Sequence, residues 1–216
     1  VTTNIIPAFG FGTSLTICAG GAIPILTTTS TNGITGVWNP AVVSDHASAI
    51  YTFTPDAGLC AIPATFTVTV NPNITPTFSF GTSLSACSGA TVPALPATSD
   101  NGITGVWNPS VIDNQNSGTY TFIPDAGLCA VATSLTVTIN PNVTPTFAFG
   151  TAVTICSSSA GPDLLLTSTN GITGTWNPAV VDNQADGVYT FTPTAGQCAT
   201  TTTLTVTVTP TVIPVF

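Results

Sequence analysis

The chain repeats itself with a period of 69 residues, three times over. Trp38, Trp107 and Trp176 stand 69 positions apart, and the six cysteines follow the same interval. The string at 32–40 recurs whole at 101–109, and at 170–178 with Thr175 as the only change. Because no insertion breaks this register, each repeat is expected to form one closed structural module. Three tandem copies suit a molecule that spans distance or presents one surface many times, and an enzyme rarely needs them.

Charge is almost absent from the chain. Lys, Arg, Glu and Met do not occur, and eight Asp give a net charge of −8. Only 4% of residues are charged, against about 25% in a typical protein. Without cationic side chains there is no clamp for phosphate groups, so nucleic acid is excluded as a partner. The apolar residues come in short alternating runs, far from the ~18 consecutive ones of a membrane span, so membrane insertion is not expected.

The cysteines come in pairs that are 42 positions apart in every repeat. This spacing predicts one structural disulfide inside each module, namely Cys18–Cys60, Cys87–Cys129 and Cys156–Cys198. Free or metal-bound thiols are the alternative, but no second pair lies nearby and the single His46 is replaced by Gln in the other repeats. Disulfides indicate an oxidising compartment, so an extracellular, cell-surface location is expected.

The local patterns are those of β-strands. Thr65–Val70 alternates strictly, with Phe66 and Val68 on one face and Thr on the other. Tyr51–Phe53 is expected to form a second strand, and the residues around Phe9 and Phe11 a third. Asn-Gly at 32–33 favours a tight hairpin turn.

About six or seven short strands per repeat, with a Trp between two cysteines, indicate an immunoglobulin-like module. The predicted fold is therefore all-β, a tandem array of three Ig-like β-sandwich modules with one disulfide each. The Tyr lies nine residues before the second Cys, so the tyrosine corner of that fold is not established by the sequence. A carbohydrate-stacking platform is the alternative role for the Trp residues. The expected core residues are Trp38, Trp107, Trp176, Tyr51, Tyr120 and Tyr189.

The domain boundaries follow from the period. Residues 1–8 are expected to end a preceding linker, 9–77 and 78–146 to form the first two Ig-like repeats, and 147–216 to form the third with the start of the next linker. The linkers at 71–76 and 140–145 carry two prolines each, which favours an extended, semi-rigid spacer. Since the chain starts and stops inside the repeat pattern, we expect it to be a piece of a longer array.

No catalytic residue, metal ligand or cofactor site is expected. A site used by every module should recur in every module, yet His46 is unique and each Asp lacks an acidic counterpart in at least one other repeat. Calcium between modules is the alternative, but it needs clustered carboxylates and the linkers contain no Asp.

The string at 118–130, Gly-Thr-Tyr-Thr-Phe-Ile-Pro-Asp-Ala-Gly-Leu-Cys-Ala, followed by Thr-rich alternation and Asn-Pro-Asn, resembles repeats of very large surface proteins of Bacteroidota such as flavobacteria. Those proteins include gliding-motility adhesins exported by the type IX secretion system. The resemblance implies a non-enzymatic stalk or fibre of a long extracellular surface adhesin, with gliding motility as one setting. The alternative is the building block of a self-associating extracellular filament or sheath, and a carbohydrate-binding module is a third reading. The expected partners are other repeats of the same chain, with lateral self-association or a surface polysaccharide as further possibilities.

Overall fold

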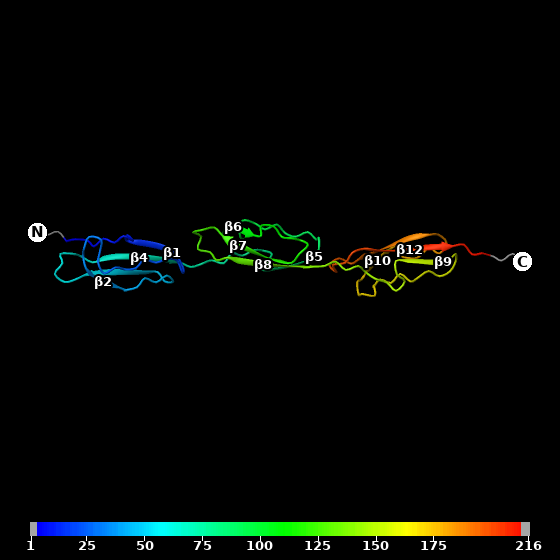
Figure 1. Cartoon of the computed structure of the whole chain (residues 1–216), viewed down its shortest axis with the longest axis horizontal. Helices are drawn as coiled ribbons and strands as arrows, with labels where there is room; N and C mark the ends of the chain where they lie inside the picture. The colour runs from blue at the N-terminus through cyan, green and yellow to red at the C-terminus, as the bar shows by residue number, and fades with distance from the viewer. Residues whose placement is uncertain (1–3, 213–216) are drawn as a thin grey trace. The chain divides into compact units, whose positions relative to one another are not determined.

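The computed structural model describes residues 4–212, and in this part of the chain all regular structure is β (Figure 1). Each repeat contributes four strands. In the first repeat they are β1 (Ser14–Cys18), β2 (Gly36–Asn39), β3 (Ala49–Pro55) and β4 (Ala64–Asn71). In the second they are β5 (Ser83–Cys87), β6 (Gly105–Asn108), β7 (Gly118–Pro124) and β8 (Thr133–Asn140). In the third they are β9 (Ala152–Cys156), β10 (Gly174–Asn177), β11 (Gly187–Pro193) and β12 (Thr202–Thr209).

The four strands of a repeat form one mixed sheet, with the order β1-β4-β3-β2 in the first repeat and the equivalent order in the others. β2, β3 and β4 pair antiparallel, whereas β1 pairs parallel with β4, with Cys18 opposite Asn71. This parallel pairing brings the last residues of β1 and β4 to the same end of the sheet. Figure 1 shows β1 beside β4 in the first repeat.

The Thr-rich alternation explains the strands. In β4 the side chains of Phe66 and Val68 are fully buried, while Thr65, Thr67 and Thr69 on the opposite face are exposed. Removing such large apolar side chains from water contributes about 1.5–3 kcal/mol each. Strand β2 ends at a cis Asn39–Pro40 bond, and a cis Asn-Pro bond stands at the same place in each repeat.

The core of each repeat is aromatic. Trp38 is 7% exposed and Tyr51 only 1%, and both lie in one cluster with Phe53 and Phe66. The ring of Phe9 packs 4.8 Å from Trp38 and 4.9 Å from Phe53, centroid to centroid. The other expected core residues are buried too: Trp107, Trp176, Tyr120 and Tyr189.

Two details of the predicted fold are wrong. In the described residues each repeat has four strands in one sheet instead of six or seven in two. Loop residues such as Ile34 and Val43 complete the core, and the first repeat adds only isolated bridges, Ile5 to Ala61 and Thr29 to Thr35. Phe9 and Phe11 lie in a turn, not a strand, because Gly12 has φ +78° and its N–H donates to the Phe9 carbonyl. Their rings stack 5.3 Å apart, and both pack against the core. The turn therefore places residues i and i+2 on the same side, as a strand would.

The chain divides into two compact units, and the border between them passes through the second repeat. One unit comprises the residues up to 81 with 95–110 and 121–134, and the other comprises 82–94, 111–120 and the residues from 135 onwards. The domain boundaries at 9–77, 78–146 and 147–216 stay a prediction, and positions 1–3 and 213–216 of those ranges lie outside the described residues.

Candidate functional site: the junctions between repeats

The disulfides join neighbouring repeats. Cys18 is bonded to Cys129, and Cys87 to Cys198, each pair 111 positions apart. The predicted bonds within a module, Cys18–Cys60, Cys87–Cys129 and Cys156–Cys198, are therefore wrong. The first cysteine of one repeat instead meets the second cysteine of the following repeat.

The sheet explains why the two cysteines of one repeat do not meet. Cys18 ends β1, and because β1 runs parallel to β4 it lies beside the last residue of β4. Cys60 lies in the turn before β4 begins at Ala64. The eight residues of β4 therefore separate the two cysteines, a rise of about 26 Å at ~3.3 Å per residue. A disulfide needs Cα atoms only about 5.5 Å apart.

The linker completes the first junction by binding both sides of it. The side-chain amide of Asn73 donates to the carbonyl of Ala19, which follows Cys18 (3.0 Å). The N–H of the next residue, Ile74, donates to the carbonyl of Cys129 (2.8 Å), and the Ile74 carbonyl accepts from Val131. Ile74 of the linker therefore forms an isolated parallel β-bridge with Ala130, the residue after Cys129. All residues of this junction lie within one compact unit.

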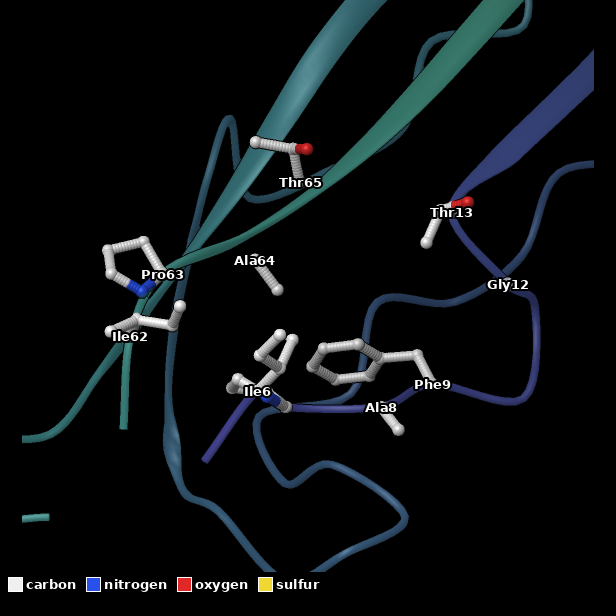
Figure 2. A pocket seen from close by; sticks show the side chains of 10 residues that line it. Ile6, Ala8, Phe9, Gly12, Thr13, Ile62, Pro63, Ala64 and Thr65 are labelled. Atoms are coloured by element: carbon white, nitrogen blue, oxygen red, sulfur yellow. The ribbon is translucent and has the colours of Figure 1, made fainter. Parts of the chain in front are cut away.

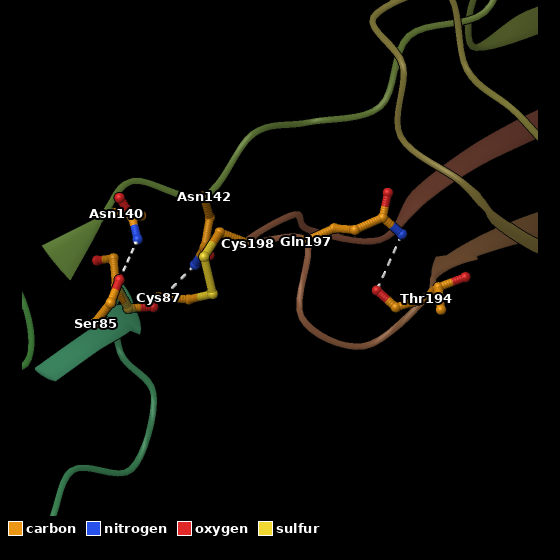
Figure 3. Close-up of a disulfide and its surroundings, with 8 residues drawn as sticks. Ser85, Cys87, Asn140, Asn142, Thr194, Gln197 and Cys198 are labelled. Carbon is orange, nitrogen blue, oxygen red and sulfur yellow. Dashed lines mark hydrogen bonds between the residues drawn. A yellow bond between two sulfur atoms is a disulfide. The ribbon is translucent and has the colours of Figure 1, made fainter. Parts of the chain in front are cut away.

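The second junction, inside the other unit, has the same construction (Figure 3). Asn142 donates to the carbonyl of Ser88, which follows Cys87 (2.9 Å), and the N–H of Val143 donates to the carbonyl of Cys198 (2.8 Å). The Cα atoms of the two bonded cysteines are 5.0 Å apart, as they are in the first junction. Identical geometry in two places indicates that the junction is a property of the repeat.

The Trp residues are held as buried core rings. The indole N–H of Trp38 donates to the carbonyl of Thr27, and both Phe9 and Phe53 pack against its ring. Trp107 and Trp176 make the same bond, to Pro96 and Leu165. The three indole rings are thus packed as core rings, and Trp176 also lines the small hollow of the third repeat.

Tyr51 fixes the loop before its own strand. Its hydroxyl accepts a hydrogen bond from the N–H of Ser44 (2.8 Å), seven residues upstream. Tyr120 and Tyr189 accept from Asp113 and Asp182 in the same way. A tyrosine hydroxyl bonded to backbone a few residues upstream is the bonding pattern of a tyrosine corner, although the distance to the next Cys differs.

Three of the Asp residues that vary between repeats, Asp113, Asp182 and Asp186, accept hydrogen bonds from backbone N–H groups. Asp113 accepts from the N–H of Gln115 (2.8 Å), and the hydroxyl of Ser44 has the same role in the first repeat, toward His46. Likewise Asp186 accepts from Val208, where the first repeat uses Ser48. Ser and Asp are interchangeable as local turn acceptors, so the exchanges between repeats keep the turns while the charge varies.

One ion pair occurs among residues 4–212, between His46 and Asp45. The hydrogen bond from His46 lowers the pKa of the exposed Asp45 carboxyl. Among the described residues no three His, Cys, Asp or Glu side chains come together in a way that could hold a metal ion. Nor does that part of the chain contain a helix long and apolar enough to cross a membrane.

A hollow of about 610 Å³ lies beside the segment that leads into the first repeat (Figure 2). Ile6 and Phe9 line one side of it, and Ile62 and Ala64 the other. The third repeat has a hollow of about 200 Å³ at the equivalent place, with Thr144 in the position of Ile6. The linings of both hollows are apolar or hydroxylic, so they provide neither an acid–base pair nor a charged anchor.

No protein-family model matches the chain, and no curated protein matches it. Among solved structures, the four N-terminal Ig domains of Dscam1 isoform 8.4 are similar at 10% identity with a TM-score of 0.25, covering 74% of this chain and 55% of that one. A second Dscam structure, solved to explain isoform specificity, is similar at 9% identity with a TM-score of 0.24, covering 74% and 54%. The chain thus spans about half the length of these structures. A likeness at such low TM-scores establishes neither the fold nor the function of this chain.

The fold and the junctions define a disulfide-bonded, all-β repeat protein. Disulfides of this kind form and persist in oxidising surroundings, as in extracellular or secreted proteins.

Proposed function

We propose that the chain is a load-bearing stretch of stalk in a long extracellular surface adhesin, and that its work is mechanical instead of enzymatic. The observation that carries this proposal is the pairing of Cys18 with Cys129 and of Cys87 with Cys198. A bond inside a module would protect only that module, whereas these bonds tie each repeat to its neighbour in parallel with the linker. Two covalent connections per junction suit a tether under tension.

We further propose that each repeat is Ig-like. Strands β2, β3 and β4 would correspond to strands C, F and G of an immunoglobulin domain. Trp38 lies on β2, as the core Trp lies on strand C, and Tyr51 lies on β3, as the corner Tyr lies on strand F. The bond between the Tyr51 hydroxyl and Ser44 adds support. The loops that cover this sheet would stand for the second sheet of the sandwich.

The parent protein we propose is a Bacteroidota surface protein exported by type IX secretion, with a gliding-motility adhesin as one form of it. The support is the repeat string at 118–130 and its counterparts. Attachment to the cell surface belongs to this proposal.

A self-associating filament or sheath is the second candidate. The observation that favours it is the exposed face of each sheet, where Thr65, Thr67 and Thr69 follow one another along β4 without a charge. Neutral hydroxyl faces can approach without charge repulsion, so lateral packing of several chains would be possible.

Stretching single molecules by force tests the stalk. In the oxidised chain the shortest covalent path from Cys18 to Cys198 crosses to Cys129, returns 42 residues to Cys87 and crosses again. The fully unfolded stretch from Cys18 to Cys198 should therefore reach a length of only about 150 Å, against roughly 600 Å for the 180 residues of the reduced chain, at ~3.4 Å per residue. A double variant, Cys18→Ser with Cys87→Ser, should show the long extension without reductant. An oxidised chain that extends as far as the reduced one would contradict the proposal.

A further inference from the structure

One asparagine in each repeat holds the segment through which the chain enters that repeat. In the first repeat this entry segment comprises residues 6–8. The carboxamide of Asn32 donates to the carbonyl of Ile6 (2.9 Å) and accepts from the N–H of Ala8 (3.1 Å). Its oxygen also accepts from the hydroxyl of Ser30 (2.7 Å), which is 5% exposed. One side chain therefore binds backbone groups that lie 24 and 26 positions earlier.

The same three hydrogen bonds, which we call the Asn clamp, recur in the other two repeats. The equivalent asparagines are Asn101 and Asn170, and the oxygen of each accepts a bond of 2.7 Å from a buried serine two positions earlier. The backbone groups that they bind lie at the end of each linker: Thr75, Thr77, Thr144 and Thr146. Each clamp lies within one compact unit. The clamp thus fastens the linker to the hairpin of the repeat that follows it.

A glycine follows the asparagine of every clamp, at Gly33, Gly102 and Gly171. Because glycine has no Cβ, its backbone nitrogen can approach the preceding carboxamide with little hindrance. In the folded repeat this approach is blocked. The N–H of Gly33 donates to the carbonyl of Ser30 (3.0 Å), and the other two glycines make the same bond. The nitrogen that would attack and the carboxamide that it would attack are therefore both held by other partners.

We propose that Asn32, Asn101 and Asn170 are deamidation sites that are closed in the folded repeat and open when the repeat unfolds. Conversion to aspartate or isoaspartate then marks a repeat that has been unfolded, and it weakens the hold on the entry segment. This inference goes beyond the stalk proposal, because the clamp and its chemistry are the same whether or not the chain bears load.

The reaction consumes one water molecule and releases one ammonia. Hydroxide removes the proton of the Gly33 N–H, and the backbone nitrogen attacks Cγ of Asn32. A bond forms between them, and the side-chain nitrogen leaves, takes a proton from water and so restores the hydroxide. Water then opens the five-membered succinimide at one of its two carbonyl groups. The product is aspartate or isoaspartate, and no atom is oxidised or reduced.

The product lacks the donor on which the clamp depends. A carboxylate at position 32 has no N–H for the carbonyl of Ile6, so two oxygen atoms would face each other where nitrogen and oxygen now lie 2.9 Å apart. Loss of one partner leaves the other unsatisfied, which costs more than the bond itself contributes. In isoaspartate the main chain also runs through Cγ, which lengthens the turn. Either product therefore loosens the entry segment.

Rates of deamidation in two states of the full chain test the proposal. Peptide mapping by mass spectrometry follows the three sites in the folded, oxidised chain and in the chain reduced and unfolded in guanidinium, at the same mildly alkaline pH. Three hydrogen bonds hold each carboxamide, so at about fivefold per bond the folded chain should react roughly a hundredfold more slowly. Equal rates in the two states would overturn the proposal.

Ser30→Ala removes one bond of the first clamp and leaves the other two clamps intact. In the folded variant we expect deamidation of Asn32 to accelerate about fivefold, with unchanged rates at Asn101 and Asn170 in the same molecules. An unchanged rate at Asn32 would show that the clamp does not protect it. Equal acceleration at all three sites would show that overall unfolding sets the rate, and it would contradict the proposal as well.

Asn32→Asp tests the effect of the product on the entry segment. The N–H of Thr31 donates to the carbonyl of Ala8 (2.8 Å), and in hydrogen–deuterium exchange it should exchange about fivefold faster than in the parent chain. The equivalent N–H of Thr169 in the third repeat is the internal control. Asn4→Asp, which adds the same charge outside the clamp, should leave both rates unchanged. No acceleration at Thr31, or the same acceleration in Asn4→Asp, would remove the assigned role of the clamp.

Discussion

The side chain of Asn73 donates a hydrogen bond to the carbonyl of Ala19, 54 positions earlier in the chain. Ala19 follows Cys18, and the residue after Asn73 binds the carbonyl of Cys129. Two consecutive linker residues thus hold the residue after Cys18 and the backbone of Cys129 itself. This arrangement makes the linker the part that sets the register between one repeat and the next.

Asn73→Ala should make the Cys18–Cys129 bond easier to reduce. Loss of one hydrogen bond costs about 1 kcal/mol, so transient opening of the junction should rise roughly fivefold. The measurement is the rate of reduction by a small thiol, followed by alkylation and mass spectrometry. The Cys87–Cys198 bond of the same molecule, with Asn142 unchanged, is the internal control. Equal acceleration at both bonds would show that the substitution acts on the whole chain.

Peptide mapping should recover Cys18 joined to Cys129 and Cys87 joined to Cys198, with Cys156 open to alkylation. The chain lacks Lys and Arg, so the digest needs an enzyme that cleaves at aromatic residues or Asp. If Cys87 is instead found bonded to Cys129, the disulfides lie within modules, and the covalent junctions between repeats do not exist.

Gly36→Ala should destabilise the first repeat by about 3 kcal/mol, because the new methyl group would overpack a filled core. A Cβ atom at this buried position would overlap the Thr54 carbonyl and lie 2.7 Å from the ring of Phe53. Gly10→Ala is the matched control, since its Cβ would meet nothing within 4 Å. Thermal unfolding of the two variants against the parent chain gives the comparison, and equal losses of stability would contradict the packing described.

Asn116→Ala should raise the pKa of Asp113. The Asn116 side chain and the N–H of Gln115 donate to the Asp113 carboxylate and hold its pKa below the ordinary value. A depressed pKa stabilises the folded chain above the unfolded pKa of about 3.9, and this contribution is lost as the pH falls through the folded pKa. An NMR titration of the Asp113 carboxyl follows the change. If the pKa of Asp113 is the same in the variant and the parent chain, the hydrogen bond from Asn116 is not what lowers it.

The strands with strict alternation could be predicted from the sequence, because their pattern depends only on local periodicity. Phe66 and Val68 face the core for that reason. Phe9 and Phe11 share the core face without being in a strand, since a glycine turn can place two rings side by side just as a strand does.

The disulfide pairing could not be predicted from the spacing of the cysteines. In a chain of exact period, separations of 42 and of 111 recur equally well from repeat to repeat, so regularity favours neither. The deciding fact is that β1 runs parallel to β4 and places Cys18 beside Asn71. That pairing is set by tertiary packing, and no local pattern reports the direction in which two distant strands align.

The two disulfide loops also overlap in sequence. The first spans the backbone from 18 to 129, and the second spans it from 87 to 198. Every peptide bond between residues 18 and 198 therefore lies inside at least one closed covalent ring. A protease that cuts once anywhere in this stretch leaves a single connected molecule, so the chain tolerates a nick that would sever an ordinary string of domains.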